Sequence, residues 1–255
     1  MTTILPLRFS LLGLIERSAA YLQGKGYGAV SIANEIKSVH AQLRKPARLA
    51  IDIGGNVGEY AAALRARNPT LEIHVFEPSP TNIEKLADRF RKDTNVYLNP
   101  YAVSDVSGSA VLYANQPGST LGSLTRRRLD HFGIAFDAAE SVNTIRFEEY
   151  WLERLGRRRM DIVKIDIEGH ELAALRGFGS ALRETSVVQF EFGGSDIDTR
   201  CYFQDFWYFF QDQGFALHRI TPLGLQHIRR YRESDEYFGA TNYIAVNRDV
   251  TAVVT

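Results

Sequence analysis

From residue 47 onward, short apolar runs alternate with stretches whose apolar residues recur at helical spacing. The apolar runs include "RLAIDI", "EIHVFE", "DIVKIDIEG" and "SVVQFEFGG", and helical patterns such as "VGEYAAALRARN", "TNIEKLADRFRKD" and "HELAALRGFGSAL" lie between them. Strands that alternate with helices over such lengths are typical of βαβ units. The sequence therefore predicts an α/β, Rossmann-like domain with a mostly parallel sheet flanked by helices.

Three segments depart from this rhythm. "VYLNPYAVS" is interpreted as one strand that bends at its proline. Residues 104–146 are rich in glycine, serine and turn residues, and they predict a short strand, a long loop and a further strand, "SVNTIRF". "DTRCYFQDFWYFFQDQG" predicts an aromatic helix whose large side chains lie mostly in the core, and "FALHRI" and "NYIAVN" predict the last strands.

The first 46 residues predict a helical cap ahead of a domain spanning residues 47–255. Residues 7–22 and 29–44 carry apolar residues at helical spacing, joined by "QGKGYG" and followed by Pro46. Arg8, Glu16 and Arg17 interrupt the apolar start, which favours an amphipathic helix over a signal peptide or membrane span. We therefore expect a cytoplasmic protein.

The composition is ordinary for a globular chain and excludes several classes of site. Of 255 residues, 45% are hydrophobic and 24% charged, and the formal net charge is +0, so no overall field favours nucleic acid. Cys201 is the single cysteine, which excludes an internal disulfide and a cysteine metal cluster. A small buried apolar role is expected for it.

The turn after the first strand, "AIDIGGNVGEY", carries the strongest indication of a ligand. A dinucleotide fingerprint fails because Asn56 stands where G-x-G-x-x-G needs its second glycine, and no phosphate loop is present. Asp52 would repel a pyrophosphate but suits an ammonium or a sulfonium. Gly54 and Gly58 let the backbone approach a ligand, and the helix N-terminus favours a carboxylate. The ammonium, the sulfonium and the carboxylate together describe S-adenosylmethionine, and Asn56 and Tyr60 complete the expected binding set of this turn.

The next two strand ends extend the cofactor prediction. Glu77 ends the second strand 19 residues after Gly58, where an acid accepts hydrogen bonds from both ribose hydroxyls, and Pro78 follows it. Such an acid fits S-adenosylmethionine and NAD alike, but the first turn disfavours NAD. Ser104 and Asp105, at the end of "AVSD", are expected to receive the adenine edge.

"DIVKIDIEGHE" places charges on a central strand that should be apolar on both faces. Lys164, Asp166 and Glu168 share one face at period two, and Glu191 ends the adjoining strand. Two interpretations stay open. Lys164 forms a structural ion pair with Asp166 or Glu191. Alternatively, Asp166 lies between the sulfonium and the acceptor, and Glu168 and Glu191 orient or deprotonate an acceptor hydroxyl.

His170, which follows in "GHE", is either the general base or a first-turn surface residue of the next helix. Asp166, Glu168 and Glu191 are also hard oxygen ligands of the kind that bind a divalent metal. No motif in the chain demands such an ion. We therefore expect no metal site, although a metal stays possible on residue type alone.

"AIDIGGNVGEY", "VFEPSP", "AVSDVSG", "VKIDIEGHE" and "FQDQGFALHRI…NYIAV" together resemble the FkbM family of S-adenosylmethionine-dependent O-methyltransferases, over roughly residues 47–248. The resemblance implies a seven-stranded methyltransferase sheet with one antiparallel strand. It also implies methyl transfer to a hydroxyl, often of a sugar or a polyketide. One departure is visible, since Glu148 or Glu149 stands in "RFEEY" where members often have Leu-Asp.

The acceptor is expected to be a sugar hydroxyl of a glycan or glycosylated metabolite. O-methylation of a polyketide or peptide, or a non-catalytic cofactor-binding subunit, are the alternatives; the complete cofactor motif argues against the last. Basic runs at residues 126–128 and 157–159 are solvated faces or hold an anionic acceptor, such as a nucleotide- or lipid-linked sugar. Tyr113, Ser119 and Thr120 of the long loop are expected at the acceptor site. The oligomeric state stays open.

Overall fold

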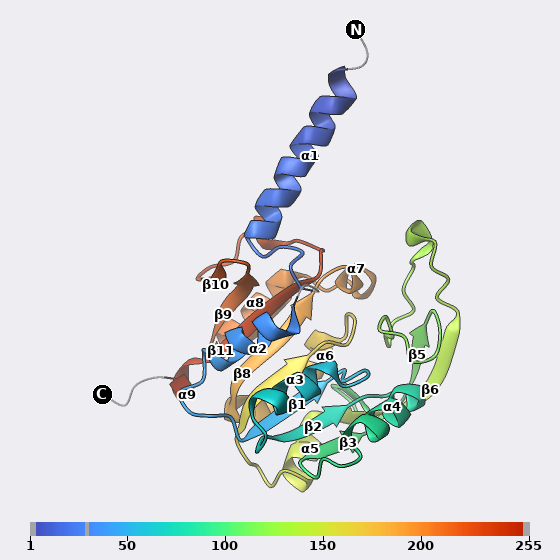
Figure 1. Ribbon diagram of the computed structural model, residues 1–255, viewed down its shortest axis with the longest axis vertical. Coiled ribbons are helices and arrows are strands. Elements are labelled where there is room, and N and C mark those ends of the chain that lie inside the picture. Colours follow the sequence, from blue (N-terminus) through green and yellow to red (C-terminus); the bar gives the residue numbers. More distant parts are fainter. Residues whose placement is uncertain (1–3, 29–30, 252–255) are drawn as a thin grey trace.

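The computed structural model describes residues 4–28 and 31–251 (Figure 1). Within this part of the chain the main sheet has eight strands: β1 (Leu49–Ile53), β2 (Glu72–Phe76), β3 (Val96–Asn99), β7 (Met160–Ile165), β8 (Thr185–Phe192), β9 (Phe215–Thr221), β10 (Gly224–His227) and β11 (Thr241–Asn247). Their order is β10-β9-β11-β8-β7-β1-β2-β3. The strands from β3 to β8 pair in parallel, whereas β11 is antiparallel to both β8 and β9.

The expected mostly parallel sheet is confirmed, but the expected number of strands is too small by one. The sheet has eight strands instead of seven, and two of them, β10 and β11, run against the others. The short edge strand β10 is the eighth strand, and it pairs antiparallel with β9. A tight hairpin joins the two: Leu223 N–H donates to Thr221 Oγ1 at 3.0 Å, and that hydroxyl donates to the Gly224 carbonyl at 2.7 Å. The turn chemistry of "TPLG" therefore adds a strand that the hydrophobic pattern alone does not indicate.

Helices cover both faces of the sheet (Figure 1). One face packs against α2 (Ile32–His40), α3 (Glu59–Arg67) and α4 (Pro80–Phe90), and the other packs against α5 (Phe147–Glu153), α6 (Glu171–Gly177) and α8 (Phe203–Asp212). Along β7, Ile162 belongs to the first core, whereas Val163 and Ile165 belong to the second. The period-two alternation predicted for this strand is confirmed.

A smaller sheet lies beside the main one. It contains β4 (Ala102–Ser104), β5 (Gly108–Ala114) and β6 (Ala138–Arg146) in the order β4-β6-β5. The strand predicted over residues 96–104 is thus two strands in two sheets. Pro100, which has no N–H to give to a ladder, stands between them. The long loop 115–137 connects β5 to β6, so both of its ends are anchored in the smaller sheet.

The two N-terminal helices differ in how they meet the body. Helix α1 (Ile4–Leu22) projects away from it (Figure 1). Helix α2 begins after Ser31, whose Oγ accepts from Asn34 N–H at 3.2 Å, and it buries Ile36 and Val39. It is shorter than the predicted helix 29–44, of which residues 29–30 lie outside the described residues. Within the described ranges, no helix has the length and apolarity needed to cross a membrane.

The predicted aromatic helix is broken in two, α7 (Ser195–Thr199) and α8, because Arg200 has φ +59°. Phe203, Phe206 and Phe210 of α8 are fully buried, as expected for core residues. Cys201 is also buried. The remaining elements are α9 (Arg248–Thr251) and three 3₁₀ turns, η1 (Asp130–Phe132), η2 (Gly179–Glu184) and η3 (Glu233–Asp235).

Candidate active site

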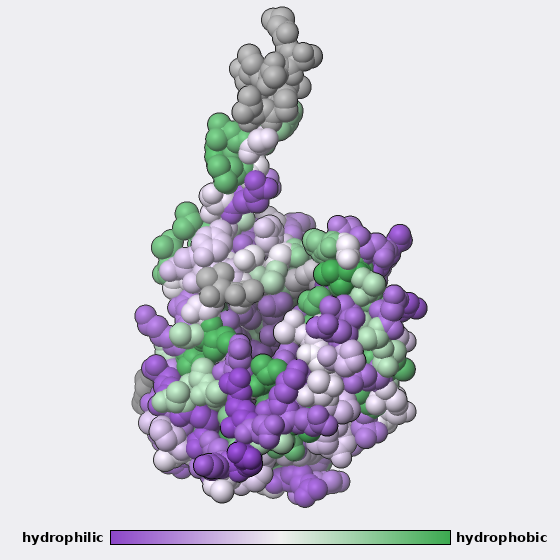
Figure 2. All heavy atoms as spheres, turned by 45° about the vertical axis from the view of Figure 1, so that its right-hand side comes forward, coloured by the Kyte–Doolittle hydropathy of each residue, from purple (hydrophilic) through white to green (hydrophobic). Residues whose placement is uncertain are grey.

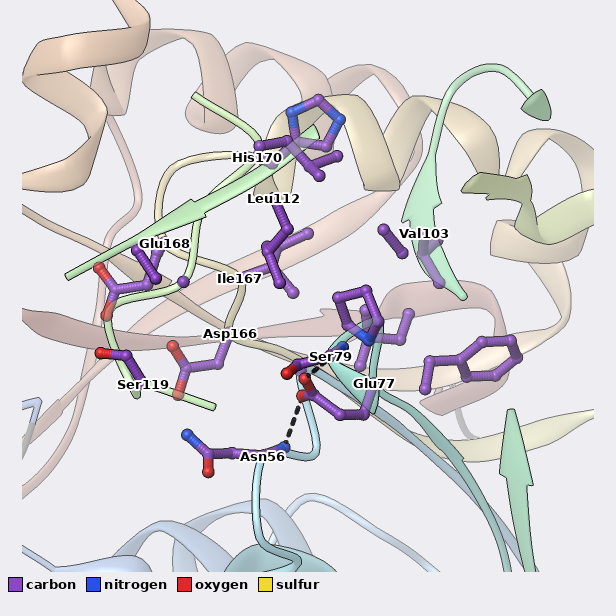
Figure 3. A pocket seen from close by; sticks show the side chains of 18 of the residues that line it. Asn56, Glu77, Ser79, Val103, Leu112, Ser119, Asp166, Ile167, Glu168 and His170 are labelled. Atoms are coloured by element: carbon purple, nitrogen blue, oxygen red, sulfur yellow. Dashed lines mark hydrogen bonds between the residues drawn. The ribbon is translucent and has the colours of Figure 1, made fainter. Parts of the chain in front are cut away.

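Two cavities meet at the carboxyl ends of β1 and β7. The first, called here the Glu77 cavity, is lined by residues from the turns after β1, β2 and β7 and from the smaller sheet (Figure 3). The second, the Glu191 cavity, is lined by α2, α3 and the ends of β7, β8 and β11. The residues common to both linings are Gly54, Asn56, Thr120, Asp166 and Glu168. A ligand that passes from one cavity to the other therefore crosses the first turn and Asp166.

Gly54 makes this junction possible. It has φ +82°, and a Cβ built on it would lie 1.9 Å from the carbonyl oxygen of Asp166. Only glycine allows the β1 turn and the end of β7 to come this close. Gly58, with φ +81°, lines neither cavity; a Cβ there would meet Phe90 and Leu86 of α4, so it serves helix packing.

Glu77 is a fixed carboxylate on the wall of the first cavity. Its Oε2 accepts from Asn56 N–H at 2.9 Å, and its Oε1 accepts from Ser79 N–H at 3.0 Å and from Asn82 Nδ2 at 3.4 Å (Figure 3). Burial raises the pKa of Glu77, and these donors oppose that rise. Pro78 and Ser79 line the same wall. The two short hydrogen bonds hold the side chain in one orientation, and of the two remaining acceptor positions one is free and the other holds only the long contact from Asn82.

The segment after β3 meets the first cavity through residues other than those predicted. Tyr101, Ala102 and Val103 line it, whereas Ser104 and Asp105 do not. The Ser104 Oγ lies 2.9 Å from Nε2 of His170, and His170 itself lines the Glu77 cavity (Figure 3). Burial lowers the pKa of this imidazole. His170 is absent from the lining of the Glu191 cavity.

Asp52 lies beneath the first turn rather than on a cavity wall. It is fully buried, and burial raises its pKa. In the sheet register Asp52 is opposite Lys164, and Lys164 is opposite Gln189 of β8. These three side chains form a polar row across β1, β7 and β8, on the face that α2 and α3 cover.

Lys164 pairs with Asp166, one of the two partners that the sequence left open. Its Nζ lies 3.1 Å from Asp166 Oδ2. Burial acts to lower the lysine's pKa, but the carboxylates of Asp166 and Asp52 outweigh it and raise the pKa. The Asp166 side chain nevertheless stays 38% exposed and lines both cavities. The ion pair therefore leaves Asp166 accessible to a ligand.

Glu168 and Glu191 complete an acidic wall. Glu168 Oε2 accepts from Arg127 Nη1 at 2.6 Å. Burial, together with Asp166, raises the pKa of Glu168 to about 7. Glu191 lines the second cavity, where burial and the nearby Asp166 and Glu168 raise its pKa to about 9. At neutral pH the structure therefore favours a protonated Glu191 beside a Glu168 that can exchange a proton.

Glu35 is a site residue that sequence reasoning missed. It comes from α2, is buried and lines the Glu191 cavity. Its Oε2 accepts from Gln189 Nε2 at 2.6 Å, and Gln189 Oε1 accepts from the Tyr60 hydroxyl at 2.8 Å. Burial raises the pKa of Glu35 to about 7. Tyr60 also lines this cavity. A glutamate in an amphipathic helix carries no local signal, and only the packing of α2 brings it here.

The long loop contributes to the cavity walls, whereas the residues of the two basic runs do not. Ser119 and Thr120 line the Glu77 cavity, whereas Tyr113 pairs its backbone with Ser123 and lines neither cavity. Arg157–Arg159 precede β7 at the opposite end of the sheet from the cavities, and Arg158 pairs there with Glu72. Arg127 is near the site, but Glu168 and Asp198 bind its guanidinium.

Glu148 and Glu149, the two candidates for the position where the chain departs from the family pattern, both lie outside the two cavities. Glu149 accepts from the Ser107 hydroxyl at 2.5 Å. Glu148 accepts from the Ser180 N–H at 2.8 Å and from the Ser180 hydroxyl at 2.6 Å, which ties α5 to η2. Across residues 4–28 and 31–251, no three His, Cys, Asp or Glu side chains are arranged to hold a metal ion.

The chain is similar to several known methyltransferases. Residues 52–217 match the Methyltransferase FkbM domain. The chain is 24% identical over 198 residues to the 2-O-methyltransferase NoeI of Sinorhizobium fredii, covering 73% of this chain and 80% of NoeI. It is 26% identical over 138 residues to the hexuronic acid methyltransferase AglP of Haloferax volcanii, covering 54% of this chain and 52% of AglP.

A solved FkbM methyltransferase from Methylobacillus flagellatus aligns with 80% of this chain and 44% of its own, at 15% identity and a TM-score of 0.49.

Proposed function

Since the chain belongs to the FkbM family of methyltransferases, we propose that this enzyme transfers a methyl group from S-adenosylmethionine to a hydroxyl of a sugar in a glycan or glycosylated metabolite. The names of NoeI and AglP, a 2-O-methyltransferase and a hexuronic acid methyltransferase, support this acceptor class. The observation that carries the proposal is the junction of the two cavities at Gly54 and Asp166.

The residues of the Glu77 cavity suit the adenosine end of the cofactor. Glu77 is oriented by backbone donors and can accept from both ribose hydroxyls. The apolar side chains of Val103, Leu112 and Ile167 suit the flat faces of an adenine ring. At the junction, Asp166 and Glu168 are anionic partners for a sulfonium. When bound, the cofactor supplies an electrophilic methyl carbon with a neutral thioether as its leaving group.

The acids of the Glu191 cavity suit the acceptor. An alcohol attacks a methyl carbon well only when its proton has a destination. Glu168, with a pKa of about 7, takes that proton near neutral pH. Glu191, with a pKa of about 9, stays protonated and donates a hydrogen bond that orients the acceptor. Asp166, paired with Lys164, fixes the direction of approach at the junction. His170 lies on the adenosine side and takes no part in this transfer.

Charge in the second cavity favours an uncharged sugar ring. Carboxyl side chains of Glu35, Glu59, Asp166, Glu168 and Glu191 line it, and among the described residues of that lining Lys164 is the one basic side chain. Carboxylates accept hydrogen bonds from sugar hydroxyls, but they repel a phosphate or a second carboxylate. A nucleotide or lipid phosphate attached to the acceptor therefore lies outside this cavity.

Calorimetry with S-adenosylhomocysteine tests the cofactor assignment. Glu77→Ala should weaken binding by roughly 2–4 kcal/mol, through loss of two charge-assisted hydrogen bonds. Glu184→Ala, on an exposed side chain far from both cavities, should leave the affinity unchanged. Binding of NADH without binding of S-adenosylhomocysteine would refute the proposal.

Transfer of a labelled methyl group to a panel of neutral and acidic oligosaccharides then tests the acceptor class. We expect incorporation into neutral sugars, and EDTA should leave the rate unchanged because we propose no metal. Incorporation into a polyketide or peptide in place of the sugars would reject the proposed acceptor.

A further inference from the structure

Helix α1 carries an exposed apolar surface. Phe9, Leu11, Leu12, Leu14, Ile15, Tyr21 and Leu22 are between 42% and 68% exposed. None of the described side chains of this helix belongs to a hydrophobic core cluster. Figure 1 shows the helix standing clear of the body, and Figure 2 shows green, hydrophobic patches on it below the grey tip, with purple, hydrophilic atoms nearer the body. So many exposed apolar side chains on one projecting helix indicate a surface that binds another protein or a membrane.

The distribution of these side chains favours a lipid surface over a second helix. At about 100° per residue, the seven side chains spread over roughly two-thirds of the helix circumference. A two-stranded helix pair buries only a narrow seam of apolar residues. The broad arc of α1 instead suits partial insertion into the boundary between lipid headgroups and acyl chains.

Basic side chains lie at the base of α1. Arg229, Arg230 and Arg232 are exposed on the segment that follows β10. This segment adjoins the end of α1, because Lys25 Nζ donates to the carbonyl of Ser234 and a Cβ on Gly24 would contact Ile220.

Acids of the same segment are used internally. Asp235 pairs with the buried Arg219 at 3.0 Å. Glu236 accepts from the backbone N–H groups of Phe203 and Gln204, both at 2.9 Å. Glu233 remains exposed, against three exposed arginines. The surface beside the apolar helix therefore carries an excess of positive charge.

We propose that α1 and Arg229, Arg230 and Arg232 together bind the surface of an anionic lipid bilayer. The helix supplies apolar area and the arginines supply attraction to lipid phosphates, and the strength of interfacial binding increases with both. In this proposal the contact is peripheral, with α1 lying in the boundary between lipid headgroups and acyl chains.

Co-sedimentation of the full chain with vesicles tests this proposal without any methyl-transfer assay. One set of vesicles is phosphatidylcholine, and the other contains equal parts of phosphatidylcholine and phosphatidylglycerol. We expect binding to the anionic vesicles and its loss in Leu11→Glu/Ile15→Glu. Arg229→Gln/Arg230→Gln should weaken binding about 25-fold, at about fivefold per arginine. Arg154→Gln/Arg183→Gln, two exposed arginines at the opposite end, should bind like the wild type.

Three results would overturn the proposal: no binding of the wild type to anionic vesicles, equal binding to both kinds of vesicle, or binding that Arg229→Gln/Arg230→Gln leaves unchanged. Light scattering gives a fourth result that would overturn the proposal. If the wild type is a dimer and Leu11→Glu/Ile15→Glu is a monomer, a second copy of the chain covers α1. Unchanged S-adenosylhomocysteine affinity in each variant shows that the body is folded. That affinity also separates failure here from failure of the proposed function.

Discussion

The two faces of the central strands differ in kind. Toward α5, α6 and α8 the face is apolar and aromatic, and the ring of Phe190 packs in parallel planes with Phe206 and Tyr243 at 4.9 and 5.4 Å between centroids. Toward α2 and α3 the same strands carry Asp52, Lys164 and Gln189 side by side. Both faces are equally closed to solvent along these strands.

This difference separates stability from chemistry. Burying the aromatic face contributes favourably to folding, whereas burying charges costs free energy even when they are paired. The charged row lies directly before the point where the two cavities meet. A fold selected for stability alone would fill this row with apolar side chains. We therefore infer that the charged row serves the cavities. Substitutions on the charged face should mainly lower activity, and substitutions on the aromatic face should mainly lower stability.

The largest effect is expected at Asp166. Asp166→Asn should lower kcat on an acceptor found with the glycan panel by roughly 100-fold, the cost of misplacing a reactant by about 1 Å, because Asp166 fixes the direction of approach at the junction. The fold should survive, because Asp52 remains beside Lys164 as a partner for the buried cation. Methyl transfer and thermal unfolding are measured on one preparation. A destabilised variant with normal activity per folded molecule would make the ion pair merely structural.

Phe190→Ala is the matched change on the aromatic face. Phe190 is fully buried, so its truncation should cost about 3–5 kcal/mol of unfolding free energy. Folded molecules should bind S-adenosylhomocysteine normally, because Phe190 lines neither cavity. Urea unfolding and calorimetry give the two quantities. If Asp166→Asn and Phe190→Ala change the unfolding free energy and the activity per folded molecule in the same way, the two faces do not differ in role.

Glu35 should make the stability of the charged face depend on pH. Burial raises its pKa from an ordinary 4.5 to about 7, so between these values the folded state holds more protons than the unfolded state. The free energy of unfolding therefore falls as pH rises through this window, by about 1–3 kcal/mol from this one group. Glu35→Gln has no such proton to lose. Urea unfolding at pH 5 and pH 8 should show a smaller fall for this variant than for the wild type. If the unfolding free energy falls equally with pH in the wild type and in Glu35→Gln, Glu35 does not have the raised pKa assigned to it.

The fold was predictable because its signals are local. Continuous apolar runs, helical spacing and Pro46 place the elements, and the alternation along β7 assigns Lys164 and Asp166 to one face. The errors arose where local signals compete with packing. Pro100 divides a run that looks like one strand, and the hairpin at Thr221 adds β10.

The site was predictable only in part, for a related reason. Glu77 and Asp166 end strands, and parallel strands bring such ends together without further information. Glu35 reaches the Glu191 cavity, which Asp166 also lines, from 131 residues before Asp166, and only the docking of α2 on the sheet determines this. Ser104 shows the converse error, because its strand is correctly near the cavity but its side chain turns toward His170.

The smallest effect is expected from single hydroxyls, and their coupling tests the comparison most finely. Tyr60 donates to Gln189 on the charged face, and the Tyr150 hydroxyl lies 2.6 Å from His74 Nδ1 on the other face. Tyr60→Phe and Tyr150→Phe should each cost about 1 kcal/mol of unfolding free energy. Combined with Glu35→Gln, Tyr60→Phe should deviate from additivity by at least about 0.5 kcal/mol, because both contact Gln189. Tyr150→Phe shares no partner with Glu35 and should add to Glu35→Gln within about 0.5 kcal/mol. Additivity in both double variants would mean that the hydrogen-bonded chain from Tyr60 to Glu35 does not act as one unit, and the charged face would then be a set of independent contacts.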